Sequence, residues 1–170
     1  MIDLTDKIHL RWMVRDDMGE VLEIEKSAFE FSWTEEEFRR CLRQRNCIGM
    51  VAEYDEKVVG FMIYELHRSK LNVLNFAVSP ELLRSGIGTA MSNKLISKLS
   101  VQRRDKITLL VRETNLDAQL FFQKRGFKAI EIVKNSYDET TEDAYLMQYD
   151  FAPSNKLDLK NRILNIGKTV

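Results

Sequence analysis

The residues best suited to chemistry in this chain form a short glycine-containing stretch at its centre. Arg84-Ser85-Gly86-Ile87-Gly88-Thr89 follows an apolar run and opens an amphipathic one. Backbone N–H groups at a helix N-terminus lack partners within the helix and carry the positive end of its dipole. Glycine lets a phosphate approach them closely, and Arg84 adds a formal charge. The stretch predicts a pyrophosphate site, although a helix start that only needs tight packing would show the same glycines.

Two common phosphate-binding motifs do not fit this stretch. No Gly-Lys-Ser/Thr follows the glycines, which excludes a Walker loop. Met91 stands where the dinucleotide-binding fingerprint has a third Gly or Ala, and the glycines do not follow the strand directly. A phosphate would therefore be held by the helix start itself.

Hydrophobic periodicity predicts the elements that position the stretch. Apolar runs indicate strands, and stripes at helical spacing indicate helices. The predicted strands cover residues 8–14, 48–54, 58–66, 71–78, 107–111, 127–133 and 144–151, and the predicted helices cover 17–28, 34–42, 86–99 and 115–125. This order predicts an α/β (α+β) fold with a mixed, mainly antiparallel sheet of about seven strands and helices on both faces.

Two of the predicted helix starts carry capping signals. Asp17-x-x-Glu20 and Thr34-x-x-Glu37 both match the capping box, in which the two side chains satisfy free N–H groups at the helix start. Gly126 follows the last predicted helix and is expected to end it.

The amino-acid composition limits the classes of protein to which the chain can belong. The chain has 170 residues, of which 44% are hydrophobic and 31% charged, and its net charge is zero. We expect one domain over residues 1–151 and a tail over 152–170, either a short helix or a mobile segment. Zero net charge argues against a nucleic-acid binder, and the sequence shows no membrane span or signal peptide. We expect a cytoplasmic protein, either a monomer or a homodimer.

Cysteine and histidine are too few for a structural metal. The chain has two of each, and we expect Cys41 and Cys47 to be buried, reduced residues. Charge is uneven along the chain, because residues 84–128 hold ten bases and three acids while 131–151 hold six acids and one Lys. Ordinary solvated faces would explain this, and so would an anion site beside a surface that attracts cations.

Four motifs in order carry a resemblance to a known family. Phe76-Ala77-Val78-Ser79-Pro80 with the glycine stretch resembles the acetyl-CoA loop of the GNAT N-acetyltransferases, and its RimI-like branch in particular. The similarity covers about residues 8–151. The other motifs are Ala28-Phe29-x-Phe31-Ser32-Trp33-Thr34, Val111-Arg112-x-x-Asn115 with Gly126-Phe127, and Asn135-x-Tyr137 with Glu142-Asp143-Ala144.

The resemblance implies a role for each motif. The backbone of Phe76, Ala77 and Val78 would hold the acetyl and pantetheine arm of acetyl-CoA at a splayed strand pair. The amides of Arg84, Ser85, Gly86, Ile87, Gly88 and Thr89 would hold its pyrophosphate. Asn115 would bond the cofactor or simply cap its helix. Phe31, Trp33 and Tyr137 would line the acceptor site.

The chain departs from the family where acid–base chemistry is expected. Leu83 stands where the family has Gln or Arg, and Arg84 is expected to compensate. Leu110 stands at the position of the branch's general base, and Phe122 at that of its general acid. Tyr137 is the catalytic candidate that we name first, with proton removal through water; Glu113 and His67 have weaker claims.

The implied function is an acetyl-CoA-dependent N-acetyltransferase acting on a peptide or protein amine, in particular an N-terminal α-amine. The apolar residues at positions 110 and 122 leave two alternatives open. One is transfer to a small amine, and the other is a CoA-binding module with weak catalysis. The acids Asp138, Glu139, Glu142 and Asp143 are expected at the amine entrance, where they would steer cationic acceptors.

Overall fold

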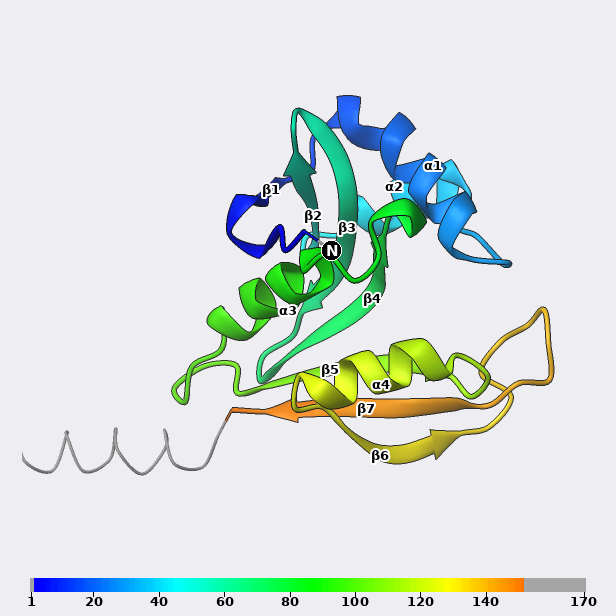
Figure 1. Ribbon diagram of the computed structural model, residues 1–170. Coiled ribbons are helices and arrows are strands. Elements are labelled where there is room, and N and C mark those ends of the chain that lie inside the picture. Colours follow the sequence, from blue (N-terminus) through cyan, green and yellow to red (C-terminus); the bar gives the residue numbers. More distant parts are fainter. Residues whose placement is uncertain (1, 152–170) are drawn as a thin grey trace, which may run out of the picture.

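A mixed seven-stranded sheet with the order β1-β2-β3-β4-β5-β7-β6 organises the molecule (Figure 1). The computed structural model describes residues 2–151, so the predicted tail lies outside the described residues. All neighbouring strands are antiparallel except β4 and β5. The elements are β1 (His9–Trp12), α1 (Met18–Ala28), α2 (Glu35–Leu42), β2 (Cys47–Tyr54), β3 (Lys57–Leu66), β4 (Lys70–Val78), α3 (Ile87–Ser97), β5 (Lys106–Arg112), α4 (Leu116–Lys124), β6 (Lys128–Val133) and β7 (Ala144–Asp150).

The predicted order of elements and the predicted fold class are confirmed. Short 3₁₀ turns at Thr5–Lys7, Arg15–Asp17 and Pro80–Leu82 are additional to the predicted elements. No helix within residues 2–151 is long and apolar enough to cross a bilayer.

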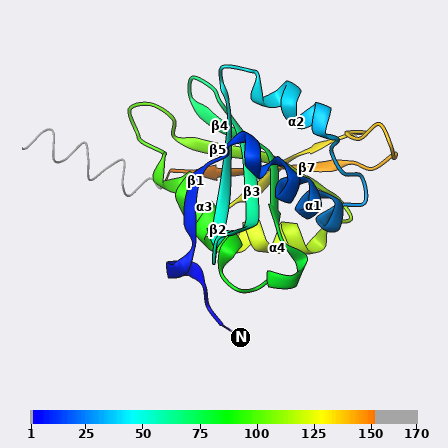
Figure 2. The same cartoon turned by 90° about the horizontal axis from the view of Figure 1, so that it is seen from above.

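Helices cover both faces of the sheet, and each face has its own core. Val21 and Phe38, from α1 and α2, pack on Phe61 of β3. On the other face, Met91 of α3 and Phe122 of α4 belong to a larger apolar cluster. Figure 2 shows the central strands between these two pairs of helices. Because the central strands are buried on both sides, they carry the continuous apolar runs that the sequence shows.

Only one of the two predicted capping boxes forms. Thr34 Oγ1 accepts a hydrogen bond from the Glu37 N–H at 3.3 Å, and Glu37 accepts from the Thr34 N–H at 2.6 Å. The box predicted at Asp17 and Glu20 is wrong. The buried Asp17 carboxylate instead pairs with Arg11 of β1 at 2.8 Å and makes no bond to the start of α1, because a cation is a stronger partner than a helix N–H.

Strands β4 and β5 pair only over their first halves. Their parallel register runs from Lys70 opposite Lys106 to Val73 opposite Leu109. Beyond that point β4 continues to Val78 and β5 to Arg112, and the two strands diverge (Figure 1). The split leaves backbone groups on both facing edges without a partner strand, so an extended ligand can bond there.

A buried carboxylate supports the strand at this split. Glu25, on α1, is only 1% exposed. It accepts hydrogen bonds from the Trp33 N–H at 2.8 Å and from Asn75 Nδ2 of β4 at 2.9 Å. Burial raises the pKa of Glu25, against these two bonds. Glu25 thus ties the loop after α1 to the diverging half of β4.

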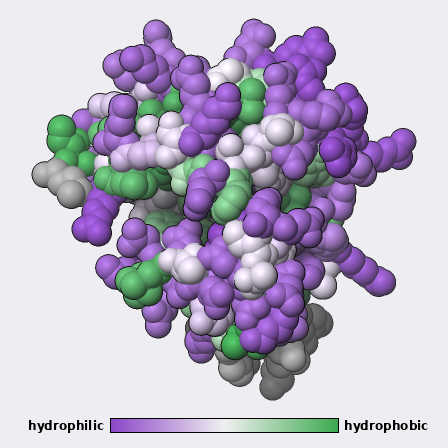
Figure 3. Space-filling view, turned by 90° about the vertical axis from the view of Figure 1, so that its right-hand side faces the viewer, coloured by the Kyte–Doolittle hydropathy of each residue, from purple (hydrophilic) through white to green (hydrophobic). Residues whose placement is uncertain are grey.

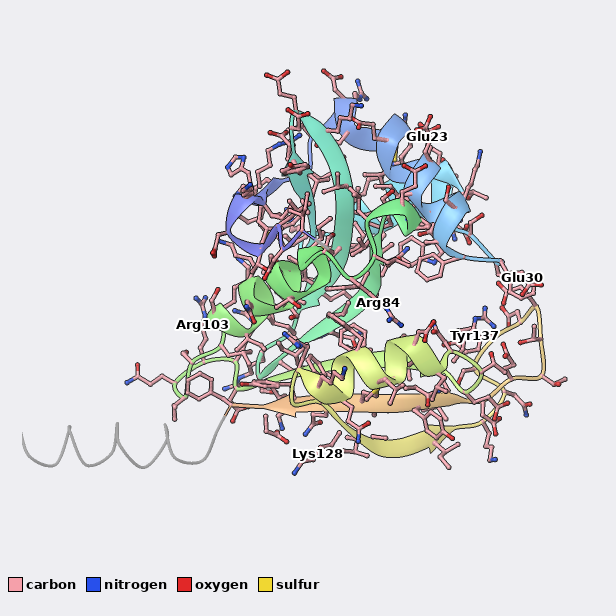
Figure 4. All side chains as sticks on the ribbon, viewed as in Figure 1. Glu23, Glu30, Arg84, Arg103, Lys128 and Tyr137 are labelled. Atoms are coloured by element: carbon pink, nitrogen blue, oxygen red, sulfur yellow. The ribbon has the colours of Figure 1, made fainter. Side chains whose placement is uncertain are left out.

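We predict that Glu25→Ala lowers the free energy of unfolding by about 2–4 kcal/mol, because it leaves the buried Asn75 amide and the part-buried Trp33 N–H unpaired. Glu23→Ala on the outer side of the same helix, where Figure 4 places Glu23, is the matched control and should change stability by less than about 0.5 kcal/mol. Urea unfolding of both variants measures the difference. Equal effects of the two substitutions would contradict this role of Glu25.

Candidate active site

The glycine stretch forms a free helix start, as predicted. Gly86 is the N-cap of α3 with φ of 87°, and Arg84 also has a positive φ, of 62°. The Ala90 N–H bonds to the Gly86 carbonyl at 2.9 Å and is the donor that begins the helical pattern. The N–H groups of Ile87, Gly88 and Thr89 precede it and remain available to an anion.

The N-terminal segment supports this loop from behind, which the sequence did not reveal. The Leu4 N–H donates to the Ser85 carbonyl at 2.7 Å, and Leu4 is buried. The Asp3 carboxylate accepts from the Thr5 hydroxyl at 2.6 Å, which lowers the pKa of Asp3. A Cβ on Gly86 would overlap the Thr5 hydroxyl oxygen and lie 2.6 Å from Asp3 Oδ1. Gly86 is therefore required both by its backbone angle and by this close approach.

The second glycine of the stretch, Gly88, is required for packing rather than for its backbone angle. A Cβ on Gly88 would lie 3.1 Å from the Phe121 ring of α4, so this residue lets α3 and α4 pack closely. Arg125 Nη1 donates to Thr89 Oγ1 at 3.2 Å, across the same contact. The tight-packing interpretation thus applies to Gly88, and the pyrophosphate site at the N–H groups of the helix start stays a prediction.

The predicted cofactor strand lies where the split opens. Phe76, Ala77 and Val78 form the last three residues of β4, beyond its final pair with β5. The Phe76 ring contacts Phe122 of α4 at 5.4 Å between centroids. Asn115 caps α4, accepting from the Ala118 N–H at 3.1 Å, and no described residue bonds its amide nitrogen. The cap role is confirmed, and that nitrogen remains available to a ligand.

Two of the three predicted acceptor residues are brought together by Arg112. Its guanidinium carbon lies 3.6 Å from the centre of the Tyr137 ring and 5.0 Å from that of Phe31. The Trp33 ring instead packs on the Phe38 ring, toward the core, with 5.1 Å between the two ring centroids. Burial raises the pKa of Tyr137, while the Arg112 charge opposes that shift. The Tyr137 phenol is therefore neutral near pH 7.

The face at the open end of the split is apolar at its centre. Figure 3 shows hydrophobic side chains across the middle of this face, with hydrophilic ones above and below. Exposed apolar residues on the elements around the split are Phe31, Leu83, Leu110 and Leu116. Figure 4 shows Arg84 on the loop before α3 and Tyr137 at the opposite side of the split.

Most of the predicted acidic rim is paired. Arg112 bonds Glu142 at 2.8 Å and Glu139 at 3.5 Å, and Lys134 bonds Asp143 at 2.8 Å. These carboxylates hold the connection between β6 and β7 in place, which is a structural role. Steering of cationic acceptors stays a prediction.

The two weaker catalytic candidates, His67 and Glu113, each contact a neighbouring polar group. His67 Nε2 lies 3.0 Å from Glu65 at the end of β3, and Glu113 accepts from the Asp143 N–H at 3.3 Å. No cluster of His, Cys, Asp and Glu suited to a metal occurs among residues 2–151.

Comparison with known proteins identifies this arrangement. The model of the acetyltransferase (GNAT) family matches residues 18–127. The chain belongs to the GNAT family.

GNAT relatives match most of the chain. The [ribosomal protein bS18]-alanine N-acetyltransferase of Escherichia coli K12 is 29% identical over 133 residues, covering 77% of this chain and 89% of that protein. The crystal structure of the ribosomal-protein-S18-alanine N-acetyltransferase from Escherichia coli superposes with a TM-score of 0.76 at 24% identity, covering 85% and 94% of the two chains. Arabidopsis thaliana Naa50, solved with the bisubstrate analogue CoA-Ac-MVNAL, shares the fold at a TM-score of 0.73 and 19% identity, covering 85% and 99%.

The structure keeps both departures from the GNAT pattern. Leu110 lies on β5 just beyond the last pair with β4 and is 47% exposed. It pairs in register with Leu146 of β7. Phe122 is 5% exposed among the rings of Phe76, Phe121 and Phe127. Neither position carries a group that could transfer a proton.

We predict that Gly86→Ala lowers the free energy of unfolding by about 1–3 kcal/mol, because an alanine is strained at this φ and its Cβ meets Thr5. It should also weaken acetyl-CoA binding in calorimetry, since the helix start must shift. Gly19→Ala in α1 is the control, because a Cβ there meets nothing within 4 Å. Wild-type stability and affinity in Gly86→Ala would remove the loop from the site.

Proposed function

We propose that this chain is an acetyl-CoA-dependent N-acetyltransferase that acetylates a peptide or protein amine, in particular an N-terminal α-amine. The observation that carries the proposal is the split between β4 and β5, which opens beside the free helix start of α3. A thioester and a pyrophosphate on one flexible arm match these two features. The relative in Escherichia coli, named for acetylation of a ribosomal protein alanine, supports the choice of acceptor.

Acetyl-CoA would lie along the split with its pyrophosphate at α3. The N–H groups of Ile87, Gly88 and Thr89 would bond the phosphates, and Arg84 would add charge at the rim. The open edge of β4 at 76–78 would bond the amides of the pantetheine arm, as a neighbouring strand would. The free amide nitrogen of Asn115 would donate to the same arm.

The reaction needs no covalent enzyme intermediate. The neutral amine attacks the thioester carbonyl, forming a C–N bond and a tetrahedral oxyanion that backbone N–H groups of β4 would stabilise. The C–S bond then breaks, the amine proton leaves to water, and the thiolate takes a proton. Products are the N-acetyl peptide and CoA.

Proton transfer would rely on water and on Tyr137. Leu110 and Phe122 cannot transfer a proton, and the Tyr137 phenol is neutral near pH 7, which suits a donor better than a base. Holding amine and thioester together would still accelerate the reaction without a proton-transfer pair, because orientation alone can contribute about 7–11 kcal/mol.

We place the reaction in the cytoplasm, where a ribosomal-protein acceptor would be met. This proposal rests on the composition of the chain and on the names of its relatives. Monomer and homodimer remain alternatives for its assembly.

Thiol release from acetyl-CoA with peptides, polyamines and water as acceptors tests this function. We predict turnover with peptides that carry a free α-amine, at a rate that climbs from pH 6 toward pH 8, since a free α-amine has a pKa of about 7.7–8.0. Tyr137→Phe should lower kcat more than it raises the acceptor KM. A preference for polyamines would favour the small-amine alternative, and binding without turnover would favour the CoA-binding module. A bell-shaped profile centred near pH 7 and unchanged in Tyr137→Phe would reveal a different acid–base pair.

Restoring the missing pair provides a second prediction. Leu110→Glu combined with Phe122→Tyr should raise kcat at pH 7 by at least about tenfold, because each proton-transfer group typically contributes about 10²–10⁴-fold. Ile132→Glu is the control, since Ile132 is a comparably exposed residue of β6, two strands from β5. No gain over this control would show that the two positions do not reach the reacting atoms.

A further inference from the structure

The Arg112 side chain, on β5, contacts several residues on the side of the split where the acceptor is expected. Its guanidinium bonds Glu142 Oε2 at 2.8 Å, Thr140 Oγ1 at 3.3 Å and Glu139 Oε2 at 3.5 Å. The same group lies on the faces of the Tyr137 and Phe31 rings. The Arg112 side chain is 23% exposed, so these contacts replace most of its hydration.

These partners belong to two loops that are far apart in the sequence. Phe31 lies in the loop between α1 and α2, residues 29–34, which we call the first loop. Tyr137, Glu139, Thr140 and Glu142 lie between β6 and β7, in residues 134–143, the second loop. Figures 1 and 2 both show the two loops side by side at the open end of the split. Among residues 2–151, Arg112 is the cation that lies over rings of both loops.

We propose that Arg112 is a positioning residue that joins the two loops and so sets the opening through which the acceptor amine reaches the split. This inference rests on the proposed function. Arg112 acts through Phe31 and Tyr137, which would contact the acceptor, while acetyl-CoA would bind along β4 and α3.

The chemistry of the contacts requires arginine. A planar guanidinium can lie between two rings with its flat faces while its edge N–H groups bond carboxylates. Lysine keeps the charge and can pair with Glu142, but its compact ammonium cannot cover two rings at once. Arg112→Lys therefore removes the joint between the loops and retains the ion pair.

The second loop also has contacts that do not involve Arg112. Lys134 bonds Asp143 at 2.8 Å, and the Ser136 N–H bonds the Glu142 carbonyl at 3.1 Å. Lys134→Met is thus a matched control that removes an ion pair from the same loop and leaves the joint intact. The Lys134 side chain is 73% exposed, so the chain will tolerate the change.

We compare wild type, Arg112→Lys and Lys134→Met in steady-state kinetics with a peptide acceptor and in calorimetry with acetyl-CoA. Arg112→Lys should raise the acceptor KM by about 5- to 30-fold, the loss expected for two cation–ring contacts. Its Kd for acetyl-CoA should stay within about twofold of wild type. Lys134→Met should leave both quantities within about twofold. An unchanged acceptor KM in Arg112→Lys, or an equal loss for both substrates, overturns the proposal.

Hydrogen exchange of the free protein separates this proposal from the proposed function. Arg112→Lys should speed amide exchange in both loops, whereas Lys134→Met should speed it in the second loop only. Unchanged exchange in the first loop of Arg112→Lys overturns the joint even if the enzyme is active. Faster exchange in both loops supports it even if no peptide is acetylated, in which case the proposed function is what fails.

Discussion

The divergence of β4 and β5 after Val73 and Leu109 is the constraint on which the site depends. A sheet normally satisfies each strand with two neighbours, and here the inner edges of two central strands lose that pairing over their second halves. The open edges are stable because each strand keeps its other neighbour, β3 or β7. The result is an interruption of backbone pairing in the middle of the sheet. An extended ligand arm can complete the interrupted pairing.

Hydrogen bonds from other segments of the chain fix the backbone next to the split. Glu25 ties the diverging half of β4 to the loop after α1 through Asn75 and the Trp33 N–H. Leu4 braces the glycine stretch at the start of α3 through the Ser85 carbonyl. The bonds from Glu25 to Asn75 and from Leu4 to Ser85 join residues 50 and 81 positions apart, so the preorganisation of the split depends on the tertiary fold. Preorganised donors need no rearrangement when a substrate arrives.

The site combines features expected for cofactor binding with two positions, 110 and 122, that cannot transfer a proton. The features that would hold a cofactor are present, whereas the positions for proton transfer are filled by Leu110 and Phe122. Such a site would work through orientation and oxyanion stabilisation, with water as the proton acceptor. Positioning of the acceptor would then contribute more to catalysis, because the amine must be held in line with the thioester. The contacts of Arg112 with two loops are suited to that requirement.

The order of elements, the mixed sheet and the free helix start at Gly86 could be predicted from the sequence. Hydrophobic periodicity and the chemistry of glycine are local, and each shows in a few neighbouring residues. The family and the positions of Leu110 and Phe122 also followed from short motifs in order. The Thr34–Glu37 cap formed as predicted because its partners lie three residues apart. The Asp17–Glu20 cap did not, because Arg11 on a neighbouring strand was the stronger partner for Asp17. Three contacts join residues 25 to 81 positions apart: the packing of Gly88 on Phe121, the support of Gly86 by Thr5 and the stacking of Arg112 on rings of two loops. Only the tertiary structure decides such contacts, because no local pattern encodes which distant side chain will fill the space beside a residue.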